Sequence, residues 1–168
     1  MSEISCDVIV IGAGPAGEVA AGRLADGGLE VVVVENHLVA GECSYYACMP
    51  SKALLRPGDL IDEARRIPGV MEALTGDIDV ASALARRDEV IHDLDDSVQL
   101  PWLEDKGIRL VRGSGKLTGE KTVTAGEHEI TASRAVVIST GTRPAMPPID
   151  GLADSSPWNN RAATTAEK

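Results

Sequence analysis

The sequence has 168 residues, of which 43% are hydrophobic and 25% charged, and these proportions exclude disordered and collagen-like chains. Sixteen basic residues against twenty-six acidic ones give a net charge of −10, which repels nucleic acid backbones and anionic lipid surfaces. No apolar run approaches the ~20 residues of a membrane span, and the N-terminus lacks the basic region of a signal peptide. We therefore expect a cytoplasmic α/β protein with neither nucleic acid nor membrane as its partner.

A βαβ unit is predicted at the start of the chain. Residues 7–11 are an apolar stretch of the kind buried on both faces of a parallel sheet, residues 18–25 suit a helix, and residues 29–34 suit a second strand ending at Glu35. The segment between the first strand and the helix matches G-x-G-x-x-G and consists of Gly12, Ala13, Gly14, Pro15, Ala16 and Gly17.

This motif predicts a dinucleotide site for physical reasons. Gly12 permits a tight turn, Gly14 lets a pyrophosphate approach the backbone, and Gly17 lets the helix pack closely on the sheet. The phosphates are expected over the helix N-terminus. Glu35 stands where an acid accepts hydrogen bonds from an adenosine ribose.

Two of the three cysteines, Cys43 and Cys48, are separated by four residues. Pro50 and Ser51 are typical of a first helical turn, so Cys48 is expected near a helix N-terminus, where unpaired amides favour a thiolate. The pair is interpreted as a redox-active disulfide. The alternative is a structural bridge around a small loop, which stabilises by only about 2 kcal/mol.

The remaining residues near this pair have simpler interpretations. Cys6 begins an apolar strand and is expected to be a small buried hydrophobe. Tyr45 and Tyr46 lie between the paired cysteines. They either line a substrate cleft or fill space in a chain without phenylalanine.

Helices are predicted next along the chain. After the cysteines a helix is expected, with Pro57-Gly58 kinking or restarting it, Asp59 as a possible N-cap, and Pro68-Gly69 ending it. Apolar residues at helical spacing predict one long amphipathic helix over residues 79–103. Its polar face is interpreted as solvated surface and includes Arg86, Arg87, Asp93 and Asp95.

Short β segments follow. Residues 108–111, 115–117, 122–124 and 128–131 predict an antiparallel meander, and residues 135–138 predict a strand that returns to the parallel sheet. The turn Ser-Thr-Gly-Thr comes directly after that strand, and the prolines beyond it predict a stiff connector.

Together these features resemble the class I pyridine nucleotide-disulfide oxidoreductases, which include dihydrolipoyl dehydrogenase, glutathione reductase and mercuric reductase. The resemblance rests on the glycine motif, Glu35, the Cys-x4-Cys-Met-Pro-Ser-Lys stretch and the Ser-Thr-Gly-Thr-Arg-Pro turn, in that order. It covers essentially this whole chain but only about the first third of a typical member.

The resemblance implies a Rossmann-like FAD-binding domain over residues 1–143, followed by a connector over residues 144–168 toward an NAD(P)-binding domain. It implies that electrons pass from NAD(P)H to FAD, to the Cys43–Cys48 disulfide, and then to a small-molecule or protein disulfide, in the service of cell redox homeostasis. The implied cofactor-binding residues are Gly12, Gly14, Pro15, Ala16, Gly17, Glu35, Glu42, Cys48, Lys52, Thr140 and Gly141.

The resemblance also assigns roles around the flavin ring. Cys48 is the thiol nearest the flavin, Cys43 is the outer thiol that attacks substrate, and Lys52 stabilises the reduced flavin. No metal site is expected. The family's full-length members imply a homodimer, and we expect this chain to be an N-terminal fragment that is inactive alone.

The sequence departs from the family near the cysteines. Tyr45 and Ala47 stand where Asn and Gly are usual, Ala40 replaces a glycine, and Glu42 places an acid toward the pyrophosphate unless it turns away or meets a cation. These changes keep two other interpretations open. One is a flavin-only quinone or dye reductase without a thiol relay, and the other is a non-catalytic FAD-binding module.

Overall fold

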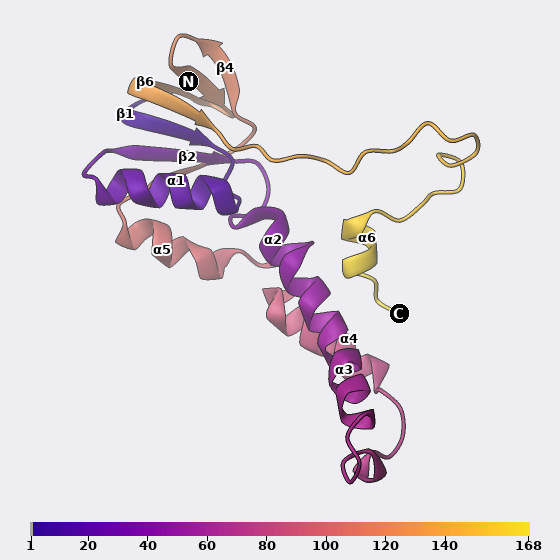
Figure 1. The fold of residues 1–168 in the computed structure, drawn as a ribbon. Helices are drawn as coiled ribbons and strands as arrows, with labels where there is room; N and C mark the ends of the chain where they lie inside the picture. The colour runs from indigo at the N-terminus through magenta and orange to yellow at the C-terminus, as the bar shows by residue number, and fades with distance from the viewer. Residues whose placement is uncertain (1) are drawn as a thin grey trace. The chain divides into compact units, whose positions relative to one another are not determined.

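The computed structural model describes residues 2–168, which form two compact units (Figure 1). The first unit comprises the chain up to Gly41 together with Asp95–Arg143, and the second comprises Glu42–Leu94 together with Pro144–Lys168. The division into an FAD-binding domain over residues 1–143 and a connector over residues 144–168 stays a prediction. The second unit also contains residues 42–94, and the sequence analysis did not predict that these residues form a unit apart from the sheet.

The first unit is built on a six-stranded sheet with the order β3-β2-β1-β6-β5-β4. Its strands are β1 (Ser2–Ile11), β2 (Val31–Glu35), β3 (Arg109–Arg112), β4 (Lys116–Gly119), β5 (Thr122–Ala125) and β6 (His128–Ile138). The first four strands in the sheet order are parallel, and β5 and β4 continue the sheet in antiparallel fashion. The predicted α/β class with a parallel sheet and an antiparallel end is confirmed.

Strand β1 is buried on both faces because its apolar side chains alternate between two clusters. Val8 and Val10 pack with Ala21 of α1 (Pro15–Asp26) and Leu103 of α5 (Leu100–Asp105). Ile9 and Ile11 belong to the other cluster, which the strands themselves supply. In Figure 1 α1 and α5 lie along the same face of the sheet. Burial on both faces explains why the end of β1, from Val8 to Ile11, is uniformly apolar.

Two predictions about strands need correction. The segment predicted at residues 108–111 is not part of the meander, because β3 pairs in parallel with β2 at the opposite edge of the sheet. The segments predicted at 128–131 and 135–138 form the single strand β6, which pairs with β1 along its whole length. The end of β6 thus returns to the parallel sheet, as predicted.

The second unit contains α2 (Gly41–Tyr45, which begins at the last residue of the first unit), α3 (Cys48–Arg65), α4 (Val80–Val90), α6 (Asn160–Thr164) and the 3-10 turns η1 (Met71–Ala73) and η2 (His92–Leu94). The predicted helix start at Cys48 is confirmed, and the helix ends before Pro68-Gly69. It continues through Pro57, so no new helix starts at Asp59. Helix α6 lies within the segment predicted as a connector.

The predicted long helix over residues 79–103 is wrong. Helix α4 starts after the N-cap Asp79, and the chain breaks at His92, Asp93 and Leu94, which all have positive φ angles between 50° and 62°. Helical structure resumes at the 3-10 turn η3 (Ser97–Gln99), and α5 follows it directly. Non-glycine residues rarely adopt this conformation, and nothing in their sequence indicates it.

Candidate active site

The three motif glycines have separate roles in the first unit. A Cβ on Gly12 would lie 2.3 Å from the Ser139 carbonyl oxygen, and one on Gly17 would lie 1.8 Å from the Gly12 carbonyl oxygen. Both positions exclude any side chain. A Cβ on Gly14 would meet only the Cα of Gly41, at 4.0 Å. Gly14 therefore keeps an open approach to the backbone, as a pyrophosphate site requires.

The N-terminus of α1 adds an anion-binding feature to this loop. Gly14 is the N-cap and supplies no side-chain hydrogen bond, and Pro15 follows at the first helical position. The first amides of a helix have no partner within the helix. The loop can therefore place a phosphate over the helix N-terminus.

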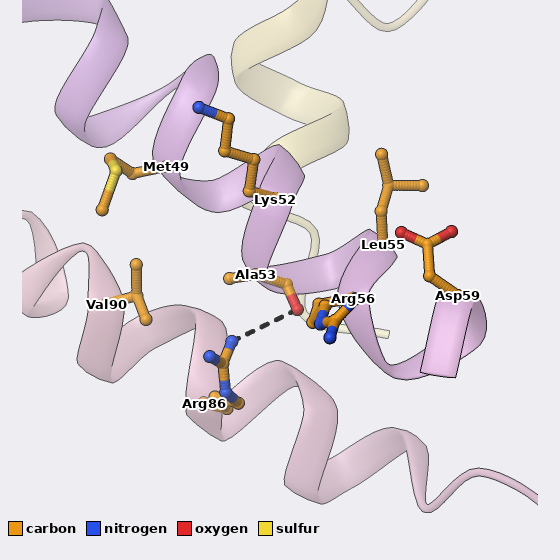
Figure 2. Close-up of a pocket in the computed structure, with 8 residues that line it drawn as sticks. All are labelled: Met49, Lys52, Ala53, Leu55, Arg56, Asp59, Arg86 and Val90. Atoms are coloured by element: carbon orange, nitrogen blue, oxygen red, sulfur yellow. Dashed lines mark hydrogen bonds between the residues drawn. The ribbon is translucent and has the colours of Figure 1, made fainter. Parts of the chain in front are cut away.

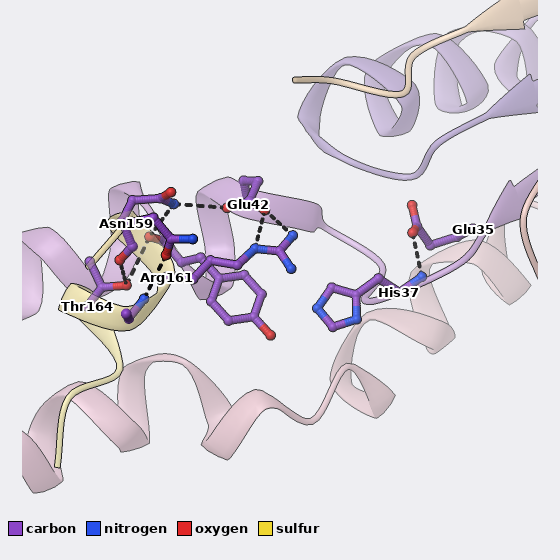
Figure 3. A network of polar contacts seen from close by, with 9 residues as sticks. Glu35, His37, Glu42, Asn159, Arg161 and Thr164 are labelled. Atoms are coloured by element: carbon purple, nitrogen blue, oxygen red, sulfur yellow. Dashed lines mark hydrogen bonds and ion pairs between the residues drawn. The ribbon is translucent and has the colours of Figure 1, made fainter. Parts of the chain in front are cut away.

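Glu35 is 9% exposed at the carboxyl end of β2. Its carboxylate accepts hydrogen bonds from the backbone amides of Ala13 and His37, each at 2.7 Å; Figure 3 shows the second of these. One acid therefore ties the glycine loop to the turn after β2. Each carboxylate oxygen retains a further lone pair for a ribose hydroxyl.

Thr140 and Gly141 follow β6 at the same edge of the sheet. The Ser139 amide donates to the Ile11 carbonyl at 2.8 Å, which places this turn beside the glycine loop. Both residues are exposed, and Gly141 has a φ of 66°. The parallel register of β1 and β6 thus brings two predicted cofactor segments together.

The turn after β2 is fixed by a residue that the sequence did not indicate. Asp96 accepts from the Val39 amide at 2.7 Å and pairs with Arg112, which also donates to the His37 carbonyl. Burial opposes ionisation of Asp96, but hydrogen bonds from Arg112 and Val39 and the Arg112 charge outweigh it and lower its pKa. Asp96 lies well away from Val39 in sequence, so no local pattern revealed this contact.

Ala40 occupies the position of a family glycine with a φ of 78°. It is 3% exposed, and its amide donates to the Ala13 carbonyl at 2.7 Å. A left-handed conformation costs an alanine about 1–2 kcal/mol. The surrounding hydrogen bonds therefore hold a strained residue next to the glycine loop.

In the second unit Cys43 lies in α2 and Cys48 is the first residue of α3. Both are free thiols; Cys43 is half-buried and Cys48 exposed. A hydrogen bond between the two side chains raises the pKa of Cys43, burial raises it further, and the Lys52 charge opposes both effects. The two thiols therefore lie in α2 and at the start of α3, on either side of the short link between these helices.

The tyrosines between these cysteines are buried, at 1% exposure for Tyr45 and 8% for Tyr46. Burial raises the pKa of Tyr46, so its phenol stays protonated. This finding favours the space-filling interpretation of the two tyrosines. Cys6 is also buried, at 6%, as predicted.

Glu42 meets a cation. Its carboxylate pairs with the Arg161 guanidinium and accepts from the Asn160 side chain at 3.1 Å (Figure 3). The Arg161 guanidinium also lies 4.5 Å from the centre of the Tyr46 ring. The negative charge that the sequence placed near the pyrophosphate is thereby neutralised within the second unit.

Lys52 lines an open pocket between α3 and α4 with a volume of about 430 Å³ (Figure 2). Met49, Leu55, Arg56 and Arg86 are among the other lining residues, and Arg86 donates to the Ala53 carbonyl at 3.5 Å. The pocket is thus lined by apolar side chains and by the cationic side chains of Lys52, Arg56 and Arg86.

Arg87 corrects a prediction, because it is not on a solvated surface. It is 2% exposed, and its guanidinium donates to the carbonyls of Thr164 and Ala166 and to Asp88. This buried arginine fixes the C-terminal segment to α4.

Comparison with known proteins finds relatives over nearly the whole chain. The family model for pyridine nucleotide-disulphide oxidoreductases matches residues 6–168. A mercuric reductase of Staphylococcus aureus is 31% identical over 87% of this chain and 27% of its own length. A dihydrolipoyl dehydrogenase of Vibrio cholerae is 33% identical over 96% of this chain and 35% of its own.

Among solved structures, the Cu(II) complex of the HOCl-induced flavoprotein disulfide reductase RclA from Escherichia coli has the same fold, with a TM-score of 0.76 at 22% identity. It is matched over 96% of this chain and 34% of its own length. The chain therefore spans about a third or less of the relatives it matches.

A parallel sheet carrying a glycine loop, together with a cysteine pair at a helix start, defines a dinucleotide-binding protein of the redox class. The chain belongs to the pyridine nucleotide-disulphide oxidoreductase family. The predicted family is confirmed. It is a family of FAD-dependent enzymes that use a pyridine nucleotide.

The residues present fit the pyrophosphate and the adenosine ribose of FAD. The loop is open at Gly14, α1 has no side-chain cap, and the Glu35 carboxylate is held at the end of β2. Within residues 2–168 no helix is long and apolar enough to cross a bilayer. The same part of the chain contains no cluster of three or more His, Cys, Asp or Glu side chains suited to a metal ion.

Proposed function

We propose that this chain supplies the FAD-binding and redox-disulfide portion of an NAD(P)H-dependent disulfide oxidoreductase. The observation that supports this best is the placement of Cys43 in α2 and of Cys48 at the start of α3, in a chain that also has an open glycine loop. The electron path runs from NAD(P)H through FAD to this cysteine pair and then to a disulfide substrate.

The cofactor-binding residues follow from this proposal. The loop of Gly12, Gly14, Pro15, Ala16 and Gly17 would hold the pyrophosphate, and Glu35 the ribose. Thr140, Gly141, Glu42, Cys48 and Lys52 are proposed for the remaining contacts, with Lys52 as the cation beside the flavin ring. When bound, FAD would accept two electrons from the nicotinamide and deliver them to the disulfide.

The chain's own cysteines carry out thiol-disulfide exchange. The Cys43 thiolate attacks one sulfur of the substrate disulfide, forms a mixed disulfide and releases the first substrate thiolate. The Cys48 thiolate then attacks the Cys43 sulfur, closes the Cys43–Cys48 bond and releases the second. Two electrons thus pass to the substrate, and its two thiolates take up two protons.

Further parts of the proposal concern the whole protein. We propose that it is a cytoplasmic homodimer that reduces a small-molecule or protein disulfide, and that residues 144–168 lead toward a nicotinamide-binding domain. The sequence contains a single G-x-G-x-x-G motif. For that reason we expect the 168-residue chain to oxidise no NAD(P)H even with added FAD.

FAD titration of the purified chain, followed by flavin absorbance after desalting, tests cofactor binding. Retained flavin supports the proposal, and a chain that stays colourless at saturating FAD contradicts it. In the parent protein, Cys43→Ser should abolish reduction of the natural acceptor. Full turnover in that variant would instead indicate the flavin-only reductase, and flavin binding with no turnover in the unmodified parent would indicate a non-catalytic module.

A further inference from the structure

A single short helix, α6, contacts the segment that joins the two cysteines. The Tyr46 carbonyl accepts hydrogen bonds from the Thr164 hydroxyl at 3.0 Å and from the Asn160 side chain at 3.3 Å. Tyr46 lies between Cys43 and Cys48, more than one hundred positions from α6 in the sequence. The backbone between the thiols is thus fixed by distant residues.

Arg161 adds two side-chain contacts to this segment. Its Nε donates to Glu42 Oε1 at 2.7 Å, and a second guanidinium nitrogen reaches the same oxygen. Its guanidinium also lies over the Tyr46 ring. Glu42 directly precedes Cys43, and its carbonyl accepts from the Tyr46 amide at 2.9 Å. One arginine therefore holds both sides of Cys43.

The docked helix is itself anchored. The Asn159 side chain, drawn in Figure 3, caps α6 by accepting from the Ala162 amide at 3.0 Å. The buried Arg87 guanidinium donates to the Thr164 carbonyl at 2.5 Å. These contacts fix the position from which Arg161 reaches Glu42. These contacts are already formed in the dithiol state, so little further conformational entropy is lost when the disulfide closes.

We propose that Arg161 is a positioning residue for the Cys43–Cys48 pair: through Glu42 and Tyr46 it holds the two sulfurs within reach and so favours disulfide closure. The inference rests on the proposed redox role of the pair. An exposed ion pair usually contributes little to folding stability. Here the ion pair with Glu42 combines with the ring contact and the two hydrogen bonds to Tyr46. Its effect therefore falls on the backbone around Cys43, and so on the geometry of the thiols.

The step to be measured is oxidation of the dithiol by glutathione disulfide. The Cys43 thiolate forms a mixed disulfide and releases one glutathione, and the Cys48 thiolate closes the intramolecular bond and releases the second. Two electrons move from the cysteines to glutathione disulfide, and the two protons leave with the glutathione thiols. Closure depends on the proximity of the two sulfurs, which is the quantity that Arg161 is proposed to control.

The experiment equilibrates the 168-residue chain with a series of reduced and oxidised glutathione ratios, quenches in acid, unfolds and alkylates it. Intact mass then separates the dithiol, with three adducts, from the disulfide, with one adduct on Cys6. We expect Arg161→Ala to lower the equilibrium constant for closure about tenfold, which corresponds to about 30 mV for a two-electron couple. The matched control is Arg134→Ala, because Arg134 is an exposed arginine paired with Asp7 in the other unit.

A second set of variants distinguishes loss of the Arg161–Glu42 contact from general loss of structure. Glu42→Ala removes the same ion pair from the other side, and the double variant should fall by less than the sum of the two single variants. A change below twofold in Arg161→Ala, an equal change in Arg134→Ala, or fully additive effects would overturn the proposal. The assay contains no FAD, so its failure is distinct from failure of the flavin titration.

Discussion

Gly14 and Gly17 have opposite environments, and this difference separates folding from cofactor binding. We predict that Gly17→Ala destabilises the chain severely, by more than about 3 kcal/mol, because its Cβ would lie 1.8 Å from a backbone oxygen. Gly14→Ala should leave the unfolding free energy within about 1 kcal/mol, because the Cβ meets only open space and Gly41. Its methyl group would nevertheless occupy the proposed pyrophosphate approach.

Urea unfolding and FAD titration of the two variants test this pair. A folded Gly14→Ala chain with weakened FAD binding is the expected result. Unchanged FAD affinity in that variant would show that the pyrophosphate does not approach Gly14.

Glu35 supports a second prediction, because its carboxylate satisfies two backbone amides at once. Glu35→Gln replaces one acceptor with an NH2 group that faces an amide donor, which should cost about 1–3 kcal/mol of unfolding free energy. Glu30→Gln is the matched control, since Glu30 is exposed near the start of the same strand. Denaturant unfolding measures both; equal stability of the two variants would rule out this role for Glu35.

Among single residues, the sequence predicted those whose role depends on neighbours in the chain. The strand, glycine loop and terminal acid follow one another, and so do Cys48 and the helix that it begins. Arg87, Asp96 and Arg161 were missed or misjudged because each makes a defining contact with a residue 57 or more positions away, namely Thr164, Val39 and Glu42. A charged residue in a helical pattern looks the same whether it faces water or buried carbonyls.

At the scale of elements, α6 depends on α4 through Arg87. We predict that Arg87→Ala lowers the stability of the second unit by about 2–3 kcal/mol, because two carbonyls lose a charged donor in a buried site. The neighbouring Arg86 is exposed and has one long contact, at 3.5 Å, so Arg86→Ala should cost less than about 0.5 kcal/mol.

Limited trypsin digestion measures the release of α6 directly, since Arg161 is a cleavage site within this helix. Faster cleavage after Arg161 is expected in Arg87→Ala and not in Arg86→Ala. Equal cleavage rates in the two variants would show that Arg87 does not anchor the helix.

The elements themselves were predictable where the pattern of residues allows one structure. A short apolar run such as that at the end of β1 has few alternatives to a buried parallel strand. The apolar spacing over residues 79–103 suits one long helix and equally suits separate helices, because both bury the same residues. The break at His92–Leu94 comes from backbone angles without glycine or proline, and the place of β3 comes from its partner β2. Neither has a local signal.

For the whole molecule, charge gives a dependence of stability on pH. The net charge of −10 produces self-repulsion at neutral pH, and protonation of carboxylates relieves it as the pH falls toward 5. Burial raises the pKa of Glu18, so the folded state takes up this proton before the unfolded state does. Both effects increase stability between about pH 7 and pH 5.

Below this range the sign reverses, because Asp7, Asp79 and Asp96 have lowered pKa values in the folded state. Asp7 accepts from the Glu30 amide, Asp79 caps α4, and Asp96 binds Arg112 and the Val39 amide despite its burial. A carboxyl with a lowered folded pKa contributes stability above its unfolded pKa of about 3.9, and this is lost as the pH falls through the folded value.

We therefore predict a maximum in the unfolding free energy near pH 5 and a steep fall below about pH 4. Urea unfolding from pH 3 to pH 7.5 at constant ionic strength measures it, with Asp96→Asn as the test of cause. That variant should lose about 1–2 kcal/mol at pH 7 and show a shallower acid limb, because its amide cannot take up a proton. If the acid limb of this variant is as steep as that of the unmodified chain, the contacts of Asp96 with Val39 and with Arg112 of β3 do not control acid stability.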